Sequence, residues 1–376
     1  MPECVNPLTP CAMTGAAAAL AGFDGITVVI HGSSGCYYYP ATLLHAPLLG
    51  TFIVGQDVIM GSEARLLEVV AEAAESGGLT AVVTSCVPAI LGEDIRSLLS
   101  PYDVVLVESP GFAGSFATGY RNALAALAPR VDTGAAGINI DGICLLDPFS
   151  AGNIRELTRL LAIARVPVAT VLCSDELSRL HACSPFTITA DGDLSSGIGT
   201  NLGGTLGPDA VRETFRRIGD ALEGSDPGPV FSEIDAEEER LIRACDKYLR
   251  RFDPPVTAIF SGGSYSAFAA GVLKKYLDAE IACIGTRTFE EIPRGFSSVP
   301  APGLNDVTAL IQKYAPDLVI GASFEKSVKG DAAFVGLTPP LRDRVRLVSR
   351  PVAGIAGTLS FMEEVLNACM DRMARR

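Results

Sequence analysis

The chain has 376 residues, of which 48% are hydrophobic and 19% are charged, and its formal net charge is −13. That length exceeds what a single hydrophobic core normally supports, so we expect two or three domains. The acidic balance and the absence of any Lys/Arg cluster argue against nucleic-acid binding, which depends on contacts to phosphates.

The mean hydropathy of +0.32 raises the question of a membrane span. Acidic residues interrupt the longest apolar stretches, whereas a spanning helix needs about 18 or more apolar residues in succession. The first residues also lack the basic segment of a secretory signal. We therefore expect a cytoplasmic protein without a membrane segment.

The first third of the chain predicts consecutive βα units. The run Ile26–Ile30 contains the β-branched Val28, Val29 and Ile30, which is typical of a strand buried on both faces. The other elements expected here are a helix over 14–21, a helix over 63–76, a strand over 81–86, a helix that starts near Pro88 with residues 92–95 in its first turns, and a strand over 104–107.

Two further sets of elements follow breaks at 132–137 and at Pro254–Pro255. The second set is expected to hold an apolar run at 142–147, a helix over 153–164, a strand over 168–172, a glycine-rich stretch at 197–207 that is either a plain loop or a phosphate-binding loop, and a helix over 233–252. The third is expected to hold a strand over 256–260, a turn at 261–264, a helix over 267–277, strands over 281–284, 318–320 and 345–348, and a helix over 359–373.

This pattern predicts an α/β protein of three doubly wound parallel-sheet, Rossmann-like domains, with limits at 1–133, 134–253 and 254–376. No segment matches the strand–GxxxxGK[ST]–helix pattern of a P-loop. We therefore expect no ATP site in this chain.

Three of the ten cysteines stand at element boundaries beside Gly, Ser or Pro: Cys11, Cys36 and Cys86. The carboxyl ends of parallel strands form the edge where α/β sheets bind ligands. Three thiols at that edge would form a soft-ligand site. We expect Cys144, Cys173, Cys245, Cys283 and Cys369 to pack as small hydrophobes instead.

Several segments resemble the nitrogenase component 1 superfamily. His31–Cys36 is similar to the HGxxGC turn of that family, Thr84–Pro88 with Leu91–Ile95 to its third-cysteine segment, and Pro110–Ser115 to its PGF turn. Relatives in the superfamily include protochlorophyllide reductase catalytic subunits and the Ni-sirohydrochlorin a,c-diamide reductive cyclase. The likeness spans nearly the whole chain.

The resemblance implies that Cys11, Cys36 and Cys86 bind an iron–sulfur cluster, most simply a 4Fe-4S cluster, at the interface of two subunits. Three thiolates leave one iron open, and the fourth ligand would come either from a partner subunit or from Cys4. The subunits would form a homodimer or a heterodimer with a related chain. A separate ATP-dependent iron protein would supply electrons.

The chain departs from the family where the nitrogenase cofactor is held. That cofactor needs a cysteine at the first turn of the third domain and a histidine late in the chain. In this chain the turn, Ser261–Ser264, contains no cysteine. The histidines are His31, His45 and His181, none of which is near the C-terminus. We therefore expect no molybdenum–iron cofactor and no dinitrogen reduction.

Three functions remain open from the sequence. The first is an oxidoreductase that reduces a small molecule, such as a tetrapyrrole, in an interdomain cleft. For that reaction Glu93, Asp94 and Glu108 are candidate proton donors, although Glu93 and Asp94 would also favour the first turn of a helix. The second is a non-catalytic scaffold for metal-cofactor assembly. The third is a metal-free binding protein whose cysteines only pack.

Overall fold

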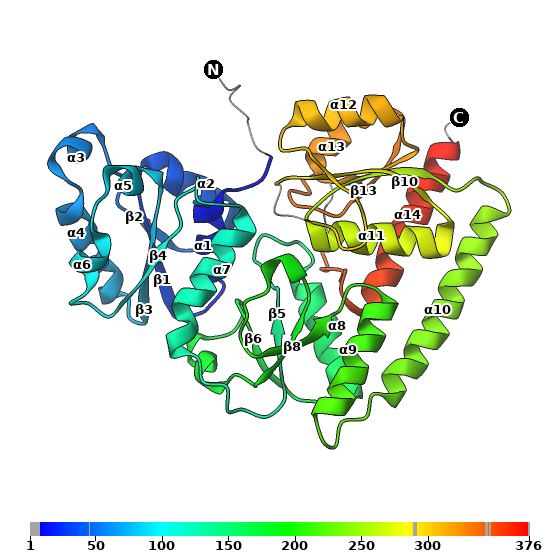
Figure 1. Ribbon diagram of the computed structural model, residues 1–376, viewed down its shortest axis with the longest axis horizontal. Helices are drawn as coiled ribbons and strands as arrows, with labels where there is room; N and C mark the ends of the chain where they lie inside the picture. Colours follow the sequence, from blue (N-terminus) through cyan, green and yellow to red (C-terminus); the bar gives the residue numbers. More distant parts are fainter. Residues whose placement is uncertain (1–7, 45, 289–291, 343–344, 346, 375–376) are drawn as a thin grey trace.

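The computed structural model describes residues 8–44, 46–288, 292–342, 345 and 347–374. Three sheets, in which every pair of strands is parallel, divide the chain into three α/β parts (Figure 1). The blue N-terminal part and the orange C-terminal part lie on either side of the green middle part, which is below them in this view. The α/β class with three parallel sheets is thus confirmed. The expected domain limits fall between elements and stay predictions.

The first sheet has the strand order β2-β1-β3-β4. Its strands are β1 (Ile26–His31), β2 (Leu48–Gly50), β3 (Leu79–Thr84) and β4 (Val104–Glu108). Its helices are α1 (Ala12–Ala21), α2 (Ser34–Leu44), α3 (Gly55–Met60), α4 (Glu63–Glu75), α5 (Cys86–Leu91), α6 (Ile95–Leu99) and α7 (Phe116–Leu127). One face of the sheet packs on α1 and α7, and the other packs on α4 and α6.

The single helix expected from Pro88 onward is wrong, because two short helices occupy that segment. Gly92, in the left-handed conformation at φ 71°, ends α5. Asp94 then caps α6 by accepting the N–H of Ser97. A left-handed glycine is a common helix terminator, and an Asp cap is a common start.

The middle sheet has the order β6-β5-β7-β8. Its elements are β5 (Ile138–Asp141), α8 (Ser150–Ile163), β6 (Val168–Val171), β7 (Phe186–Thr189), β8 (Thr200–Gly204), α9 (Pro208–Ala221) and α10 (Gly228–Leu249). The apolar run at 142–147 is a loop after β5 and not the strand. Gly142 turns it with φ +72°, which a side chain would strain. The glycine-rich stretch 197–207 is not a plain loop, because it contains β8.

The third sheet has the order β11-β10-β9-β12-β13. Its elements are β9 (Val256–Phe260), α11 (Gly263–Leu277), β10 (Glu280–Thr286), β11 (Val299–Pro300), α12 (Leu304–Tyr314), β12 (Leu318–Gly321), α13 (Ser323–Val328), β13 (Ala333–Gly336) and α14 (Gly354–Ala374). The strand expected over 345–348 is wrong for its described residues, since Val345 and Leu347 are more than nine-tenths exposed. The edge beside β12 is formed instead by β13, with Leu318 opposite Ala333.

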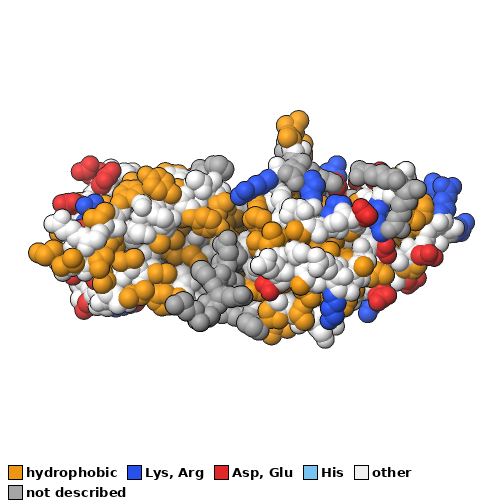
Figure 2. Space-filling model, turned by 90° about the horizontal axis from the view of Figure 1, so that it is seen from above, with side chains coloured by type: hydrophobic (Ala, Val, Ile, Leu, Met, Phe, Trp, Pro, Cys, Tyr) orange, Lys and Arg blue, Asp and Glu red, His pale blue; other side chains and the backbone are white. Residues whose placement is uncertain are grey.

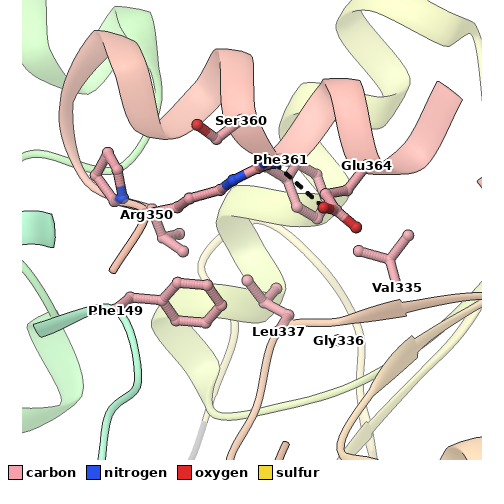
Figure 3. A pocket seen from close by; sticks show the side chains of 10 residues that line it. Phe149, Val335, Gly336, Leu337, Arg350, Ser360, Phe361 and Glu364 are labelled. Atoms are coloured by element: carbon pink, nitrogen blue, oxygen red, sulfur yellow. Dashed lines mark hydrogen bonds and ion pairs between the residues drawn. The ribbon is translucent and has the colours of Figure 1, made fainter. Parts of the chain in front are cut away.

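The last helix, α14, ties the middle part to the third part. Asn153 Oδ1 of α8 accepts the N–H groups of Val352 and Ala353, and Glu156 accepts those of Ile355 and Ala356. These acceptors satisfy N–H groups that a helix start leaves without partners. Figure 3 shows the crevice at this junction, where Arg350 pairs with Glu364 above Phe149 and Leu337.

The first and middle parts share one hydrophobic core. Buried side chains of the middle part, among them Leu172, Cys173 and Leu194, belong to the cluster that α1 and α7 form on the first sheet. Gly22 approaches the backbone of Cys173 so closely that an added Cβ would lie 2.3 Å from its carbonyl oxygen. None of the helices in the described ranges combines the length and apolar character that a membrane crossing requires.

Helices α1 and α7 contact each other through glycines. A Cβ on Gly119 would lie 1.7 Å from the carbonyl oxygen of Ala12, and one on Gly15 would lie 2.0 Å from that of Phe116. Both neighbours are backbone atoms, which do not move aside as a side chain can. The two helices are therefore closer together than any larger residue would permit.

We expect Gly119→Ala to lower the free energy of unfolding by about 3 kcal/mol, the upper end of overpacking costs, in denaturant titrations followed by circular dichroism. Gly271→Ala is the matched control, since it lies inside α11 and a Cβ there meets nothing within 4 Å. This second change should stabilise the protein by roughly 0.5–1 kcal/mol. Equal effects of the two changes would contradict the close helix contact.

Candidate functional site

The carboxyl edge of the first sheet carries the three cysteines singled out in the sequence. Cys36 is in the first turn of α2, directly after β1, and Cys86 is the first residue of α5, directly after β3. Cys11 precedes α1 and forms an antiparallel backbone bridge with Ser115, the N-cap of α7. All three are half-buried.

Two glycines show how close these cysteines lie. A Cβ built on Gly111 would be 3.2 Å from Cys11 Sγ and 3.3 Å from Cys86 Sγ, so the two sulfurs face the same point of the backbone. A Cβ on Gly32 would be 3.5 Å from Cys36 Cβ and 2.0 Å from the Oγ of Ser85, the residue before Cys86. The structure thus brings the three cysteines together at one edge. Their role as ligands stays a prediction.

The three cysteines do not form a site for a single metal ion. Within the described ranges, no group of three or more His, Cys, Asp or Glu side chains could hold one metal ion. An iron–sulfur cluster distributes its thiolates over several iron atoms, so its ligands need not converge on one point. Cys4, the candidate fourth ligand, lies outside the described residues.

The remaining described cysteines differ from these three in their surroundings. Burial raises the pKa of Cys144 to about 12 and the pKa values of Cys245, Cys283 and Cys369 to about 11. These four thiols are buried among apolar side chains, as cysteines that pack as small hydrophobes are.

Hydroxyl groups surround the three cysteines. Thr14 Oγ1 lies 3.7 Å from Cys11 Sγ, and Ser33 Oγ donates to Cys36 Sγ at 3.6 Å. Ser85 and Ser109 are 1% and 0% exposed, yet their hydroxyls have no hydrogen-bond partner in the part of the chain that the structure describes. Leaving a buried hydroxyl unsatisfied costs roughly 1–3 kcal/mol. The residues present therefore fit a buried group that accepts hydrogen bonds, as the sulfurs of a cluster do.

A buried network fixes the loops that carry Cys36 and Cys86. His31 Nε2 lies 3.2 Å from Glu93 Oε2 and 3.2 Å from Ser62 Oγ, and its Nδ1 lies 3.1 Å from Thr51 Oγ1. Ser62 Oγ also donates to Glu93 at 2.7 Å. The carbonyl of His31 accepts the N–H of Ser85, which links the ends of β1 and β3.

The three acidic candidates from the sequence have different surroundings. Glu93 belongs to the network just described and not to the first turn of a helix, while Asp94 is the N-cap of α6. Glu108 pairs with Arg96 at the exposed end of β4. None of the three lines the cavity described below, so the geometry does not support them as proton donors to a ligand there.

The segments that follow all four strands of the first sheet, among them α2, α3 and α5, expose large apolar side chains. These are Tyr38, Tyr39, Val54, Val58, Ile59, Met60, Ile90, Leu91 and Phe112. In the view from above, apolar side chains are abundant over the N-terminal part, and Lys and Arg gather toward the other end of the molecule (Figure 2). Large exposed apolar patches on soluble proteins mark interaction sites. We call this set the apolar edge.

A cavity of about 520 Å³ lies where the three parts meet. The first part contributes Tyr39 and Phe116, the middle part the loop Cys144–Pro148, and the third part the segment Thr338–Arg342. Its walls are mainly apolar. A cavity of this size between domains is a typical small-molecule site.

Polar groups gather along one wall of this cavity. Tyr265 donates to Asp147 Oδ2 at 2.7 Å, and Ser264 donates to Asp193 at 3.0 Å. Burial, followed by the charge of Asp193, raises the pKa of Asp191 well above its ordinary value. Asp191 is therefore the acidic side chain of this wall best suited to stay protonated. Sequence reasoning missed it because it lies in a loop after the undetected strand β7.

The third part contributes one buried ion pair and the turn Ser261–Ser264. Arg287 pairs with Glu325 at 2.7 Å, and both side chains are almost fully buried. Ser261 and Gly262 line the cavity, and the cysteine in its wall, Cys144, comes from the middle part. Neither Ser261 nor Gly262 can supply the thiolate that a molybdenum–iron cofactor would need at this turn.

Tyr39 connects the cysteines with the cavity. It lines the cavity, and its pKa is raised by burial and next by the charge of Cys11, while Arg342 on the far wall opposes that shift. The cavity wall also includes Pro10, the residue before Cys11. The cavity and the cysteine edge are adjacent parts of one region.

A sequence model of the family described as nitrogenase component 1 type oxidoreductase matches residues 11–370. This chain belongs to that family. Proteins of this family bind iron–sulfur clusters and work with an iron protein, which agrees with the expected classes of cofactor and partner. The cluster type, its ligands and the subunit arrangement stay predictions.

Two relatives are informative. The chain is 24% identical over 398 residues to the nitrogenase iron-molybdenum cofactor biosynthesis protein NifE of Clostridium pasteurianum, covering 94% of this chain and 86% of that protein. It is 28% identical over 189 residues to the nitrogenase molybdenum-iron protein beta chain of Bradyrhizobium diazoefficiens, covering 42% of this chain and 36% of that one. This second match spans about a third of the beta chain.

The fold also matches a solved structure, "Nitrogenase Cp1 at pH 6.5". The TM-score is 0.85 at 19% sequence identity, and the match covers 100% of this chain and 95% of that one. At this identity the likeness shows the fold. The three-part α/β architecture expected from the sequence is confirmed.

The His31 network makes stability depend on pH. Burial lowers the pKa of His31 below its ordinary value of 6.5, although the hydrogen bond and charge of Glu93 oppose the shift. The unfolded chain then takes up a proton that the folded chain does not, so the free energy of unfolding should fall as pH drops below about 6.5. Denaturant titrations across that range should show a smaller fall for His31→Gln. Identical pH profiles would contradict a neutral buried His31.

Proposed function

We propose that this chain is the iron–sulfur component of a nitrogenase-like oxidoreductase. It would accept low-potential electrons from a separate ATP-dependent iron protein and reduce a small molecule in the cavity between its three parts. The observation that carries this proposal is the meeting of Cys11, Cys36 and Cys86 around Gly111 and Gly32, beside that cavity.

The cysteine edge would hold the cluster. Cys11, Cys36 and Cys86 would provide its thiolates, with a fourth ligand from Cys4 or from a partner subunit. A bound 4Fe-4S cluster would supply one-electron redox chemistry there. Because Gly111 has no side chain, the space beside the sulfurs of Cys11 and Cys86 stays open for the cluster.

The apolar edge would be covered by protein. It borders the three cysteines on the loops of the same sheet, and its side chains include Ile59, Met60 and Ile90, each more than 70% exposed. A second subunit seated there would exclude water from the cluster and offer the missing ligand. We propose a homodimer or a heterodimer with a related chain on this ground.

The cavity favours a bulky, mainly apolar substrate with polar groups at one end. Apolar side chains from all three parts form most of the wall, and Asp147, Asp191 and Tyr265 lie together on the remaining side. Within this wall, Asp191, whose pKa is raised by burial, is our candidate for giving a proton to a reduced substrate. An unsaturated ring such as a tetrapyrrole has these properties. With Ser261 and Gly262 at the third-part turn, we propose no molybdenum–iron cofactor and no dinitrogen reduction.

The likeness to NifE supports a second candidate function. That protein is described as a cofactor biosynthesis protein, and the match covers nearly all of both chains. In this alternative the chain is a scaffold, and the cavity receives a metal cofactor under assembly in place of a substrate.

The cluster proposal predicts the iron content of cysteine variants. Protein purified without oxygen should contain iron and sulfide and absorb visible light. Cys36→Ala and Cys86→Ala should each lose most of the iron, because a cubane held by fewer thiolates dissociates. Cys283→Ala, a buried thiol in β10 away from the edge, is the control and should retain it. Iron-free wild-type protein would favour the metal-free binding protein instead.

Electron transfer separates the two candidate functions. With a reduced ATP-dependent iron protein, ATP and a tetrapyrrole, a reductase should oxidise the iron protein continuously and yield reduced ring. A scaffold should oxidise no more than stoichiometric amounts, and instead transfer its metal group to an acceptor protein. Asp191→Asn should lower kcat of the reductase by roughly 100-fold or more, as expected for loss of a general acid. Multiple turnovers unaffected by Asp191→Asn would contradict the proposed proton donor.

A further inference from the structure

We propose that the buried hydroxyls of Ser85 and Ser109 donate hydrogen bonds to sulfur atoms of the iron–sulfur cluster and raise its reduction potential. The inference rests on the proposed function, since it assumes a cluster at the cysteine edge. It assigns to two serines a role that the cysteine pattern does not contain.

The two serines occupy equivalent places in the fold. Ser85 follows β3 and precedes Cys86, and Ser109 follows the neighbouring strand β4 and precedes the turn that contains Gly111. Both strands end at the same edge, because β3 and β4 are parallel and Thr84 lies opposite Glu108. Ser85 Oγ lies beside Gly32, where an added Cβ would also approach Cys36 Cβ, and Ser109 stands two residues before Gly111, which the sulfurs of Cys11 and Cys86 approach.

The hydroxyls of Ser85 and Ser109 make no hydrogen bond to any of the described residues. Ser85 and Ser109 are 1% and 0% exposed. Other buried hydroxyls at this edge do have partners, since Ser62 donates to Glu93 and Thr51 contacts His31. Buried hydroxyls are rarely left without partners, and each exception calls for an explanation such as a missing ligand.

The neighbouring hydroxyls already contact cysteine sulfurs. Ser33 donates to Cys36 Sγ, and Thr14 lies 3.7 Å from Cys11 Sγ. With Ser85 beside Cys86, each of the three cysteines has a hydroxyl close to it in space or sequence. This is the pattern of a sulfur site surrounded by weak donors, and Ser109 adds one more from the adjacent strand.

Hydrogen bonds from these serines would change the reduction potential of the cluster. Reduction adds negative charge to the cluster, and a hydrogen bond to its sulfur stabilises that charge. Hydrogen bonds to sulfur are one of the factors that set iron–sulfur potentials. Removing a donor should therefore make the cluster harder to reduce.

The test is an EPR-monitored redox titration of the anaerobically purified full-length protein with its cluster. We expect Ser85→Ala and Ser109→Ala each to lower the equilibrium constant of one-electron reduction about tenfold, a shift of ~59 mV to more negative potential. Ser100→Ala is the matched control, because that hydroxyl lies in the same part of the chain and already donates to the carbonyl of Ser97. The reduction potential of the cluster in the Ser100→Ala variant should equal that of the wild type.

A second measurement does not depend on the folding of the alanine variants. Electron–nuclear double resonance of the reduced wild-type cluster, in H₂O and in D₂O, should reveal exchangeable protons coupled to the iron. Ser85→Thr and Ser109→Thr, which keep a hydroxyl, should retain those couplings and the wild-type potential, whereas the alanine variants should lose one coupling each.

Two results would overturn the inference, and they are distinguishable. If the wild type holds a cluster but both alanine variants keep its potential and its proton couplings, the hydroxyls do not donate to it, and the proposed function stands. If the wild-type protein contains no iron, the proposed function fails, and this inference fails with it.

Discussion

The contact between α1 and α7 places Cys11 beside the turn that follows β4. Cys11 precedes one of these helices and Ser115 caps the other, and the two residues pair through their backbones. Gly15 and Gly119 allow the backbones of the two helices to touch. Ser115 lies four residues after Gly111, the glycine that the sulfurs of Cys11 and Cys86 approach. Cys11 comes from outside the sheet, and the packing of α1 on α7 and on one face of the sheet brings it to the strand ends that carry Cys36 and Cys86.

Much of this architecture could be predicted from local sequence. Strands β1, β3 and β9 are short apolar runs with β-branched residues, and the α/β class follows from their alternation with helices. The strands that were missed have a different character. Asn139 and Asp141 are polar yet fully buried in β5, and two glycines end β8. Their polar groups are satisfied by distant partners, such as Ser196 for Asp141, which periodicity does not reveal.

The candidate site likewise contains residues that could be predicted from the sequence and residues that could not. The cysteines could be singled out because each follows or precedes a recognisable element. The partners of His31 could not, because Glu93 is 62 positions away and joins it only after the sheet has formed. The cavity residues come from three parts of the chain, so no single segment carries their pattern. That the hydroxyls of Ser85 and Ser109 have no hydrogen-bond partner among the described residues is apparent only once burial and hydrogen bonds are known.

The anchoring of α14 on the middle part has a consequence for how a ligand reaches the cavity. Asn153 and Glu156 hold the start of this helix, so the middle and third parts are joined by several buried hydrogen bonds. The first and middle parts are joined in turn by a continuous core. The remaining seam, between the first and third parts, is the side at which Tyr39 and Arg342 reach the cavity. A bulky molecule would therefore reach the cavity from the side of this seam, without displacing the buried contacts that hold the middle part to its two neighbours.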